Sequence, residues 1–465
     1  MSKLNYDILY EIFQNLQDLI NMTYSNDPDN LNKWINYKEF LRSQFSCLLV
    51  NKNWCEVMIP FLWSNPFKYG YMKSPLSKII ISHLSDNSIK ILKDENIIQT
   101  NFQKLNLSFN YVRFCKYFHD LRNVFPVDSK KLLKEEIYKL FISECSSIKC
   151  LNSDMTCYPI LKYPGANISL SNLYELNCST TNQDFYYGLA QICRSIEKIR
   201  VRIYSSEESP GIAELIEMQK QIKYVLIEGN CECKKITQAL EKHVNSIIHF
   251  ETIKYTSVIH LLIPKLINLR YLKVKDNRCE LKKYVIYLNH YNLQALDLHF
   301  ISLDIAINII KNTNGNLWRI WVECITCFDK AKEYNQTIYK YCPNIKYATV
   351  LLNKDGTLEE LENIFIKCQH LEAIDIDDEI KHEYIDKFLN LLLETAPLTL
   401  CKIHIYSMPS YLTTQSLKLF LNNWNHYKGK KTLHLYYTAS GDTYINRNIL
   451  HKYNIDFWNY YILWP

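Results

Sequence analysis

One short apolar pattern recurs at a nearly constant spacing through the last two-thirds of the chain. The pattern reads apolar-x-x-apolar-x-apolar, and its copies begin at Ile148, Leu173, Ile196, Ile222, Ile247, Leu269, Leu293, Leu317, Ile345, Leu371 and Leu400. Successive copies start 22–29 residues apart, and a degenerate further copy, KKTLHL, begins at Lys430. Because 48% of the residues are hydrophobic, single copies arise by chance, and only the spacing is informative.

The segments between the copies have the pattern of helices, as in LDIAINIIKNT (303–313) and LEELENIFIKC (358–368). Four copies share a lead-in of the form Cys-x-x-apolar, at 145–148, 193–196, 342–345 and 368–371. One strand and one helix in each 22–30 residues is typical of a leucine-rich-repeat solenoid. Residues 141–465 are therefore predicted to form an α/β solenoid with parallel strands on its concave face and helices outside. The aromatic segment IDFWNYYILWP closes its end or, alternatively, anchors a membrane or a partner.

Glycine content excludes the common nucleotide-binding folds. The chain has 9 glycines in 465 residues, and none of them forms a GxG or GxxxxGK motif. Phosphate-binding loops of Rossmann and P-loop proteins need such glycines for close backbone approach. The net charge of +6 is spread over basic residues interleaved with acidic ones, so nucleic acid is not an expected partner. No cofactor is expected.

Cysteine usage and hydropathy favour an intracellular protein. The N-terminus MSKLNYDILYEIF is unlike a secretion signal, and no apolar run reaches the roughly 18 residues of a membrane span. The 16 cysteines are then expected to be reduced thiols in the cytoplasm or nucleus, without membrane contact.

Metal and catalytic motifs are weak. Cys324 and Cys327 have zinc-ligand spacing but lack a second pair, and the acidic run from Asp375 to Glu379 is more simply a loop after a repeat strand. No GxSxG or HExxH motif occurs, and the 13 histidines have no recurrent acid or cysteine partner. We expect no metal site and no enzymatic activity. An enzyme using a cleft between residues 66–140 and the repeats remains an alternative.

The N-terminal segment contains two apolar helical patterns. Residues 4–16 carry one stripe, formed by Leu4, Ile8, Leu9, Ile12, Phe13 and Leu16. A polar loop is expected at 25–30, and a second amphipathic segment follows from Phe45 to Trp63, with Pro60 expected to end or kink its helix.

These two halves resemble an F-box. The first half matches at Leu4-Asn5, Asp7-Ile8-Leu9, Ile12-Phe13 and Leu16, and the second at Leu48-Leu49-Val50, Asn51, Trp54-Cys55 and Leu62-Trp63. Asn5 stands where the family has proline, and about twenty extra residues (21–44) separate the halves. Together with the repeats, this resembles the fungal F-box/leucine-rich-repeat proteins. The predicted domains are an F-box-like helical domain at 1–65, a linker with irregular first repeats at 66–140, and the repeats at 141–465.

The resemblance implies a substrate receptor of an SCF-type E3 ubiquitin ligase, which binds a Skp-type adaptor and through it a cullin. The implied adaptor-binding residues are Leu4, Ile8, Leu9, Ile12, Phe13, Leu16, Leu49, Val50 and Trp54. Two alternatives stay open. Residues 1–65 could be a helical cap on the solenoid, and the whole chain could be a leucine-rich-repeat scaffold unrelated to ubiquitination.

Alternate residues of each repeat strand point to the concave face, where an unidentified target protein is expected to bind. The candidate target-binding residues are Lys198, Arg200, Arg202, Tyr271, Lys273, Asp297, Arg319, Trp321, Asp375 and His404. Trp321 is the strongest candidate, because tryptophan is enriched at interface hot spots. The three basic residues at 198–202 are where phosphate contacts are expected. An ordinary solvated sheet face is the alternative.

Overall fold

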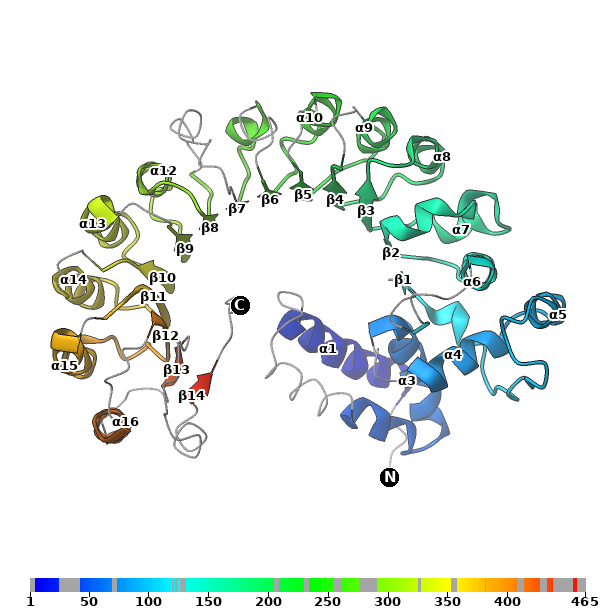
Figure 1. The fold of residues 1–465 in the computed structure, drawn as a ribbon, viewed down its shortest axis with the longest axis horizontal. Coiled ribbons are helices and arrows are strands. Elements are labelled where there is room, and N and C mark those ends of the chain that lie inside the picture. The colour runs from blue at the N-terminus through cyan, green and yellow to red at the C-terminus, as the bar shows by residue number, and fades with distance from the viewer. Residues whose placement is uncertain are drawn as a thin grey trace. The chain divides into compact units, whose positions relative to one another are not determined.

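The computed structural model describes residues 5–24, 42–68, 73–118, 121, 124–125, 131–204, 209–229, 234–254, 261–275, 291–324, 328–352, 358–380, 382–407, 414–426, 433–437 and 455–457 (Figure 1). The chain divides into two compact units. Unit 1 consists of Met1–Ile222 with Ile462–Pro465, and unit 2 consists of Lys223–Tyr461.

Unit 1 begins with a small helical part. Helix α1 (Tyr6–Tyr24) packs on α3 (Lys52–Trp63), and residues 42–48 are also helical. The shared core contains large apolar side chains that are almost fully buried, namely Leu9, Phe13, Val57, Met58, Phe61 and Leu62. Asn51 caps α3 by accepting a hydrogen bond of 3.0 Å from the backbone N–H of Trp54.

Two boundaries in this helical part differ from the sequence-based expectation. Helix α1 continues eight residues past Leu16, so residues 21–24 of the expected insertion are helical. Pro60 does not end α3, which runs on to Trp63 with Ile59 and Phe61 buried. Burial of those neighbours offsets the loss of the backbone hydrogen bond that proline cannot donate. Leu4 and residues 25–41 lie outside the described residues.

The rest of unit 1 alternates helices with short parallel strands. Its elements are η1 (Pro66–Lys68), α4 (Lys73–Ser82), α5 (Asp86–Asp94), η3 (Val112–Phe114), β1 (Tyr117–Phe118), α6 (Lys131–Glu144), β2 (Cys150–Leu151), η5 (Ser153–Cys157), η6 (Ile160–Lys162), α7 (Ala166–Ser169), β3 (Glu175–Ser179), α8 (Gln183–Ile192), β4 (Lys198–Arg202) and α9 (Pro210–Glu217). Strands β1 to β4 pair in parallel and in chain order. Strand β1 precedes the first predicted repeat copy, so the sheet begins earlier than the apolar pattern indicates.

Unit 2 continues this alternation. Its elements are β5 (Tyr224–Glu228), α10 (Lys234–Glu241), β6 (His249–Ile253), η7 (Ile263–Lys265), β7 (Tyr271–Lys275), β8 (Ala295–His299), α12 (Leu303–Lys311), β9 (Arg319–Glu323), η10 (Phe328–Lys330), α13 (Ala331–Tyr341), β10 (Tyr347–Val350), α14 (Glu359–Lys367), β11 (Ala373–Glu379), η11 (His382–Tyr384), α15 (Ile385–Thr395), β12 (Lys402–Ser407), α16 (Thr414–His426), β13 (His434–Tyr437) and β14 (Ile455–Phe457). All pairings from β5 to β14 are parallel and follow chain order. Within unit 2 the strands line the inner side and the helices lie outside (Figure 1). This is the predicted leucine-rich-repeat-like α/β solenoid.

The apolar pattern locates the strands to the residue. Each of the strands from β2 to β12 begins two residues after the first apolar residue of its copy, and those first residues are at most 1% exposed. The degenerate last copy is misplaced by two residues. Leu435 pairs with Ile403 and therefore occupies the second apolar slot, where the repeat spacing predicts Leu433. Strand β14 has no predicted counterpart.

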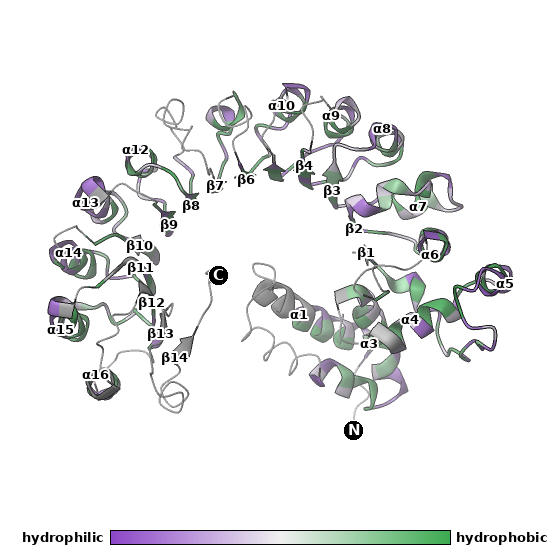
Figure 2. Ribbon diagram, in the orientation of Figure 1, coloured by the Kyte–Doolittle hydropathy of each residue, from purple (hydrophilic) through white to green (hydrophobic). Residues whose placement is uncertain are grey.

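Helices pack their apolar faces against the sheet. Hydrophobic and hydrophilic residues alternate along helices such as α8, α9 and α13 (Figure 2), as expected of helices with one apolar face. The cysteines of the lead-in are part of this core. Cys193 is fully buried, and its thiol donates a weak hydrogen bond of 3.7 Å to the backbone oxygen of Leu173, in the preceding repeat. Cys193 thus links its repeat to the preceding one.

Candidate recognition surfaces

The predicted apolar stripe of α1 divides between two faces. Leu9 and Phe13 are each 1% exposed and pack in the helical core, where the Phe13 ring lies edge-on to Trp54. Ile8 and Ile12 are 48% and 45% exposed. The division follows from helix geometry, because residues four apart share a face and adjacent residues point about 100° apart.

The remaining predicted adaptor-binding residues also differ in exposure. Leu49 and Val50 are 87% and 54% exposed at the end of the 42–50 segment, whereas Leu16 is half-buried and Trp54 packs partly against the core. Leu9 and Phe13 were therefore wrong as surface residues, since the helical core needs them. We define the apolar surface of unit 1 as Ile8, Ile12, Leu49 and Val50.

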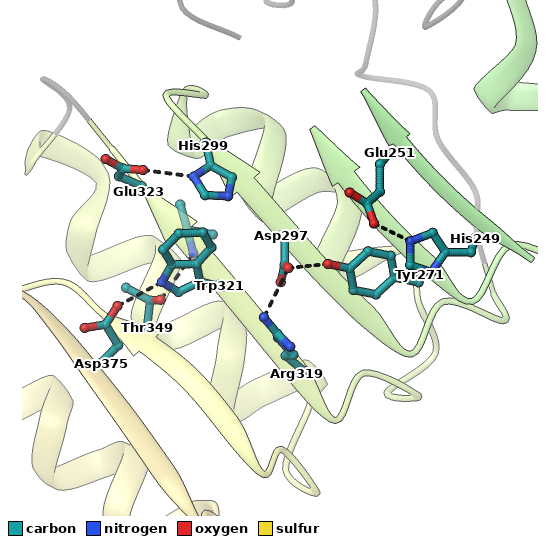
Figure 3. A network of polar contacts seen from close by, with 11 residues as sticks. His249, Glu251, Tyr271, Asp297, His299, Arg319, Trp321, Glu323, Thr349 and Asp375 are labelled. Atoms are coloured by element: carbon teal, nitrogen blue, oxygen red, sulfur yellow. Dashed lines mark hydrogen bonds and ion pairs between the residues drawn. The ribbon is translucent and has the colours of Figure 1, made fainter. Parts of the chain in front are cut away.

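The sheet face of unit 2 carries a row of hydrogen-bonded polar side chains (Figure 3). In the parallel register, Lys273 of β7 lies beside Asp297 of β8, and Asp297 lies beside Trp321 of β9. Two residues further along the same two strands, His299 lies beside Glu323. Residues at the same slot of successive repeats therefore face one another, as the repeat pattern predicts.

Asp297 is the centre of the first cluster on this face. Its Oδ2 accepts a hydrogen bond of 2.5 Å from the Tyr271 hydroxyl and one of 3.2 Å from Nη2 of Arg319. Asp297 is fully buried and Arg319 is 6% exposed, so both were wrong as exposed contacts for a target. Burial, followed by the neighbouring Asp297 charge, raises the pKa of Tyr271 far above its ordinary value. The cluster therefore keeps the phenol protonated as a hydrogen-bond donor.

Trp321 is the centre of the second cluster. Its indole N–H donates a hydrogen bond of 2.9 Å to Oδ2 of Asp375, on β11. The other oxygen of Asp375 accepts a hydrogen bond of 2.5 Å from Nδ1 of His404, on β12. His299 packs edge-on against the indole at a centroid distance of 4.0 Å and contacts Glu323 through Nδ1 at 2.9 Å. Trp321 itself remains partly exposed.

Two contributors to this face were missed by the sequence analysis. His249 of β6 stacks on Tyr271 at 4.0 Å and hydrogen-bonds Glu251 at 2.6 Å. Both occupy outward slots of the Ile247 copy, so the periodicity that selected their neighbours also marks them.

The predicted basic row of unit 1 lies on β4. Lys198 and Arg200 are exposed and Arg202 is half-buried. Lys198 forms an ion pair of 3.1 Å with Glu175 of β3. This pairing reduces the positive charge that the row presents.

Neither a metal cluster nor a membrane-spanning helix occurs in the described part of the chain. No group of three or more His, Cys, Asp or Glu residues there is placed to hold a metal ion. Cys324 is half-buried at the end of β9, and Cys327 lies outside the described residues. Among the described helices, none combines the length and apolar character that a membrane crossing requires.

Comparisons with known proteins find similarity among solved structures but not among protein families or curated proteins. No protein-family model matches the chain, and no curated protein matches it. Among solved structures, this chain is similar to a chain in the crystal structure of the Rad7 and Elc1 complex in yeast, with 11% identity and a TM-score of 0.43. The match covers 93% of this chain and 98% of that one. At this level of similarity, function has to be inferred from the chain's own residues.

Proposed function

We propose that the protein is the substrate-recognition subunit of an SCF-type E3 ubiquitin ligase. Its helical part binds a Skp-type adaptor, which connects it to a cullin, and its repeat strands bind a target protein. The observation that carries this proposal is the apolar surface of unit 1, which consists of F-box-like motif residues. The side chains of this surface are between 45% and 87% exposed, although the core residues beside them are almost fully buried.

The exposed residues are not needed for the fold of the helical part. Leu9, Phe13, Val57 and Met58 already fill the core between α1 and α3. Burying one further isoleucine or leucine is worth about 1.5–3 kcal/mol, so leaving several exposed is explained by a partner that covers them. The F-box resemblance supports a Skp-type adaptor as that partner.

The repeats support the second half of the proposal. Trp321, Asp375 and His404 lie on the sheet face of unit 2 in a fixed hydrogen-bonded arrangement. Aromatic side chains held in place lose little conformational entropy on binding, and such residues are typical of interface hot spots. The proposed protein thus recognises partners on two surfaces and carries out no chemistry itself.

Co-purification with the cognate Skp-type adaptor tests the proposal. Ile8→Asp and Ile12→Asp, introduced together in the full chain, place charges on the apolar surface without entering the core. We expect at least a ten-fold loss of bound adaptor, because each decade of affinity corresponds to about 1.4 kcal/mol. The thermal midpoint of unfolding should change little, since both side chains are about half exposed.

Ile366→Asp is the matched control, because Ile366 is a 53% exposed isoleucine on helix α14. This variant should bind the adaptor as well as the natural chain does. Failure of the folded natural chain to bind the adaptor would contradict the proposal and leave a leucine-rich-repeat scaffold unrelated to ubiquitination.

A further inference from the structure

Trp321 is held in one orientation from two sides. Asp375 accepts its indole N–H at 2.9 Å, and the His299 ring meets the indole at 4.0 Å with an interplanar angle of 80°. These contacts come from β11 and β8, on either side of β9 (Figure 3). Because the ring is fixed yet partly exposed, a partner can contact it without a large loss of side-chain entropy.

Carboxylates surround the indole. Glu323 lies two residues further along β9 and therefore on the same face of the sheet, with 31% of its side chain exposed. One of its oxygens contacts His299. Asp375, whose side chain is 12% exposed, flanks the other side of the ring. The nearby cation of Arg319 is already paired with Asp297 at 3.2 Å. The indole therefore lies between two carboxylates. Asp375 also accepts a hydrogen bond from His404, and the charge of Lys273 acts on His299.

Two buried acceptor atoms of β8 add a second observation. Because the Glu323 carboxylate accepts from Nδ1–H of His299, Nε2 of the neutral ring is an acceptor. Within the described part of the chain, neither this Nε2 nor Oδ1 of Asp297 has a hydrogen-bond partner. His299 is 4% exposed and Asp297 is fully buried. Because both atoms are buried, the N–H donors of a ligand reach them through a bridging water.

We propose that Trp321, Glu323 and Asp375 form a subsite for an arginine side chain of a target protein. The guanidinium group stacks on the indole, forms an ion pair with Glu323, and supplies N–H donors toward β8. Arginine fits better than lysine, because its planar group stacks on aromatic rings and its five donors are arranged as a fork. This inference rests on the proposed role of the repeats in target binding.

Other ligand classes fit the same surface poorly. An acidic segment would meet Glu323 and Asp375 with like charge. An apolar segment would cover Glu323 without replacing its hydration, which costs free energy. The acidic class serves as a comparison arm in the test.

Binding of short peptides to the full chain tests the subsite. The probes are acetyl-Gly-Arg-Gly-Arg-Gly-amide and the analogue in which citrulline replaces both arginines, which has nearly the same shape and no charge. Lysine and glutamate peptides of the same length complete the set. Titration is followed by fluorine NMR of the chain labelled with 5-fluorotryptophan, with the Trp321 signal identified by its loss in Trp321→Phe. The arginine peptide should shift this signal and bind about ten-fold more tightly than the citrulline analogue.

Two variants and one control locate the binding. Glu323→Gln and Trp321→Leu should each weaken arginine-peptide binding about five- to ten-fold. Glu228→Gln removes the same charge from the last residue of β5, where Ile253 and not an aromatic residue is the neighbour on β6. It should leave binding unchanged.

Three results would overturn the subsite: equal binding of the citrulline analogue, tighter binding of the glutamate peptide, or equal losses in Glu323→Gln and Glu228→Gln. If the chain still co-purifies with the adaptor, any of these contradicts the arginine subsite alone and not the proposed ligase role.

Discussion

At the scale of single residues, His299 makes the sheet face of unit 2 sensitive to acid. Burial lowers its pKa, the charge of Lys273 adds to this effect, and the hydrogen bond to Glu323 and the charge of Asp297 oppose it. In the unfolded chain histidine titrates near 6.5. The unfolded state therefore binds the proton first as the pH falls, and folding stability is lost below about pH 6.5.

We expect His299→Asn to flatten this pH dependence. Asparagine keeps an N–H donor for Glu323 but does not titrate. The free energy of unfolding of the natural chain should fall by up to about 1.4 kcal/mol per pH unit more than that of the variant between pH 6.5 and 5. Urea denaturation at several pH values measures the difference. His370→Asn, at an exposed histidine after α14, is the control. Equal slopes for the natural chain and His299→Asn would refute this account.

At the scale of elements, two glycines of unit 1 lie in close packing contacts, Gly211 against a backbone atom and Gly188 against a side chain. A Cβ added at Gly211, in the first turn of α9, would lie 2.4 Å from the backbone oxygen of Gln183 in α8. A Cβ at Gly188, inside α8, would lie 2.6 Å from the side-chain atom Cδ1 of Leu161. The leucine can rotate away, whereas the backbone oxygen can move only if the two helices separate.

Gly211→Ala should therefore destabilise unit 1 by about 1–3 kcal/mol. Gly188→Ala should cost less, because alanine in a helix interior gains up to about 1 kcal/mol over glycine. Thermal unfolding followed by circular dichroism compares the two variants. A larger loss of stability in Gly188→Ala would show that α8 and α9 do not pack as closely as described.

The same scale shows what the sequence could and could not predict. The strand at Leu317 was located correctly because its apolar residues must alternate with outward ones while the repeat length keeps neighbouring strands in register. The two-residue strand β1 was missed, since so short a segment shows no alternation. At the last copy, Leu433 and Leu435 both fit an apolar slot, so the register was ambiguous.

For the candidate sites, the sequence predicts which face of a strand or helix a residue lies on, but not whether its side chain is exposed. Alternation placed Asp297 and Trp321 on one face, but it does not report whether neighbours cover a side chain. Asp297 is buried because Tyr271 and Arg319, from the strands on either side, both reach its carboxylate. The helical stripe had the same limitation, since Leu9 and Ile8 are equally apolar and only packing against α3 separates them.

At the scale of the whole molecule, buried thiols make the fold sensitive to alkali. The cysteines in the described part of the chain are all free, and those of the repeat core are buried in both units. Burial raises the pKa of Cys150 to about 12, of Cys342 to about 11 and of Cys368 to about 12. In the unfolded chain a thiol titrates near 8.5. The folded state therefore holds more protons above that pH, and stability falls as the pH rises.

We expect the free energy of unfolding to decline between about pH 8.5 and 11, with each buried thiol contributing up to about 1.4 kcal/mol per pH unit. Urea denaturation under reducing conditions measures this slope. Cys342→Ala combined with Cys368→Ala should make it shallower, even though the lost side-chain volume lowers stability at neutral pH. Cys157→Ala, at an exposed thiol, should leave the slope unchanged. If the double variant kept the slope of the natural chain, the alkaline loss of stability would have to come from groups other than Cys342 and Cys368.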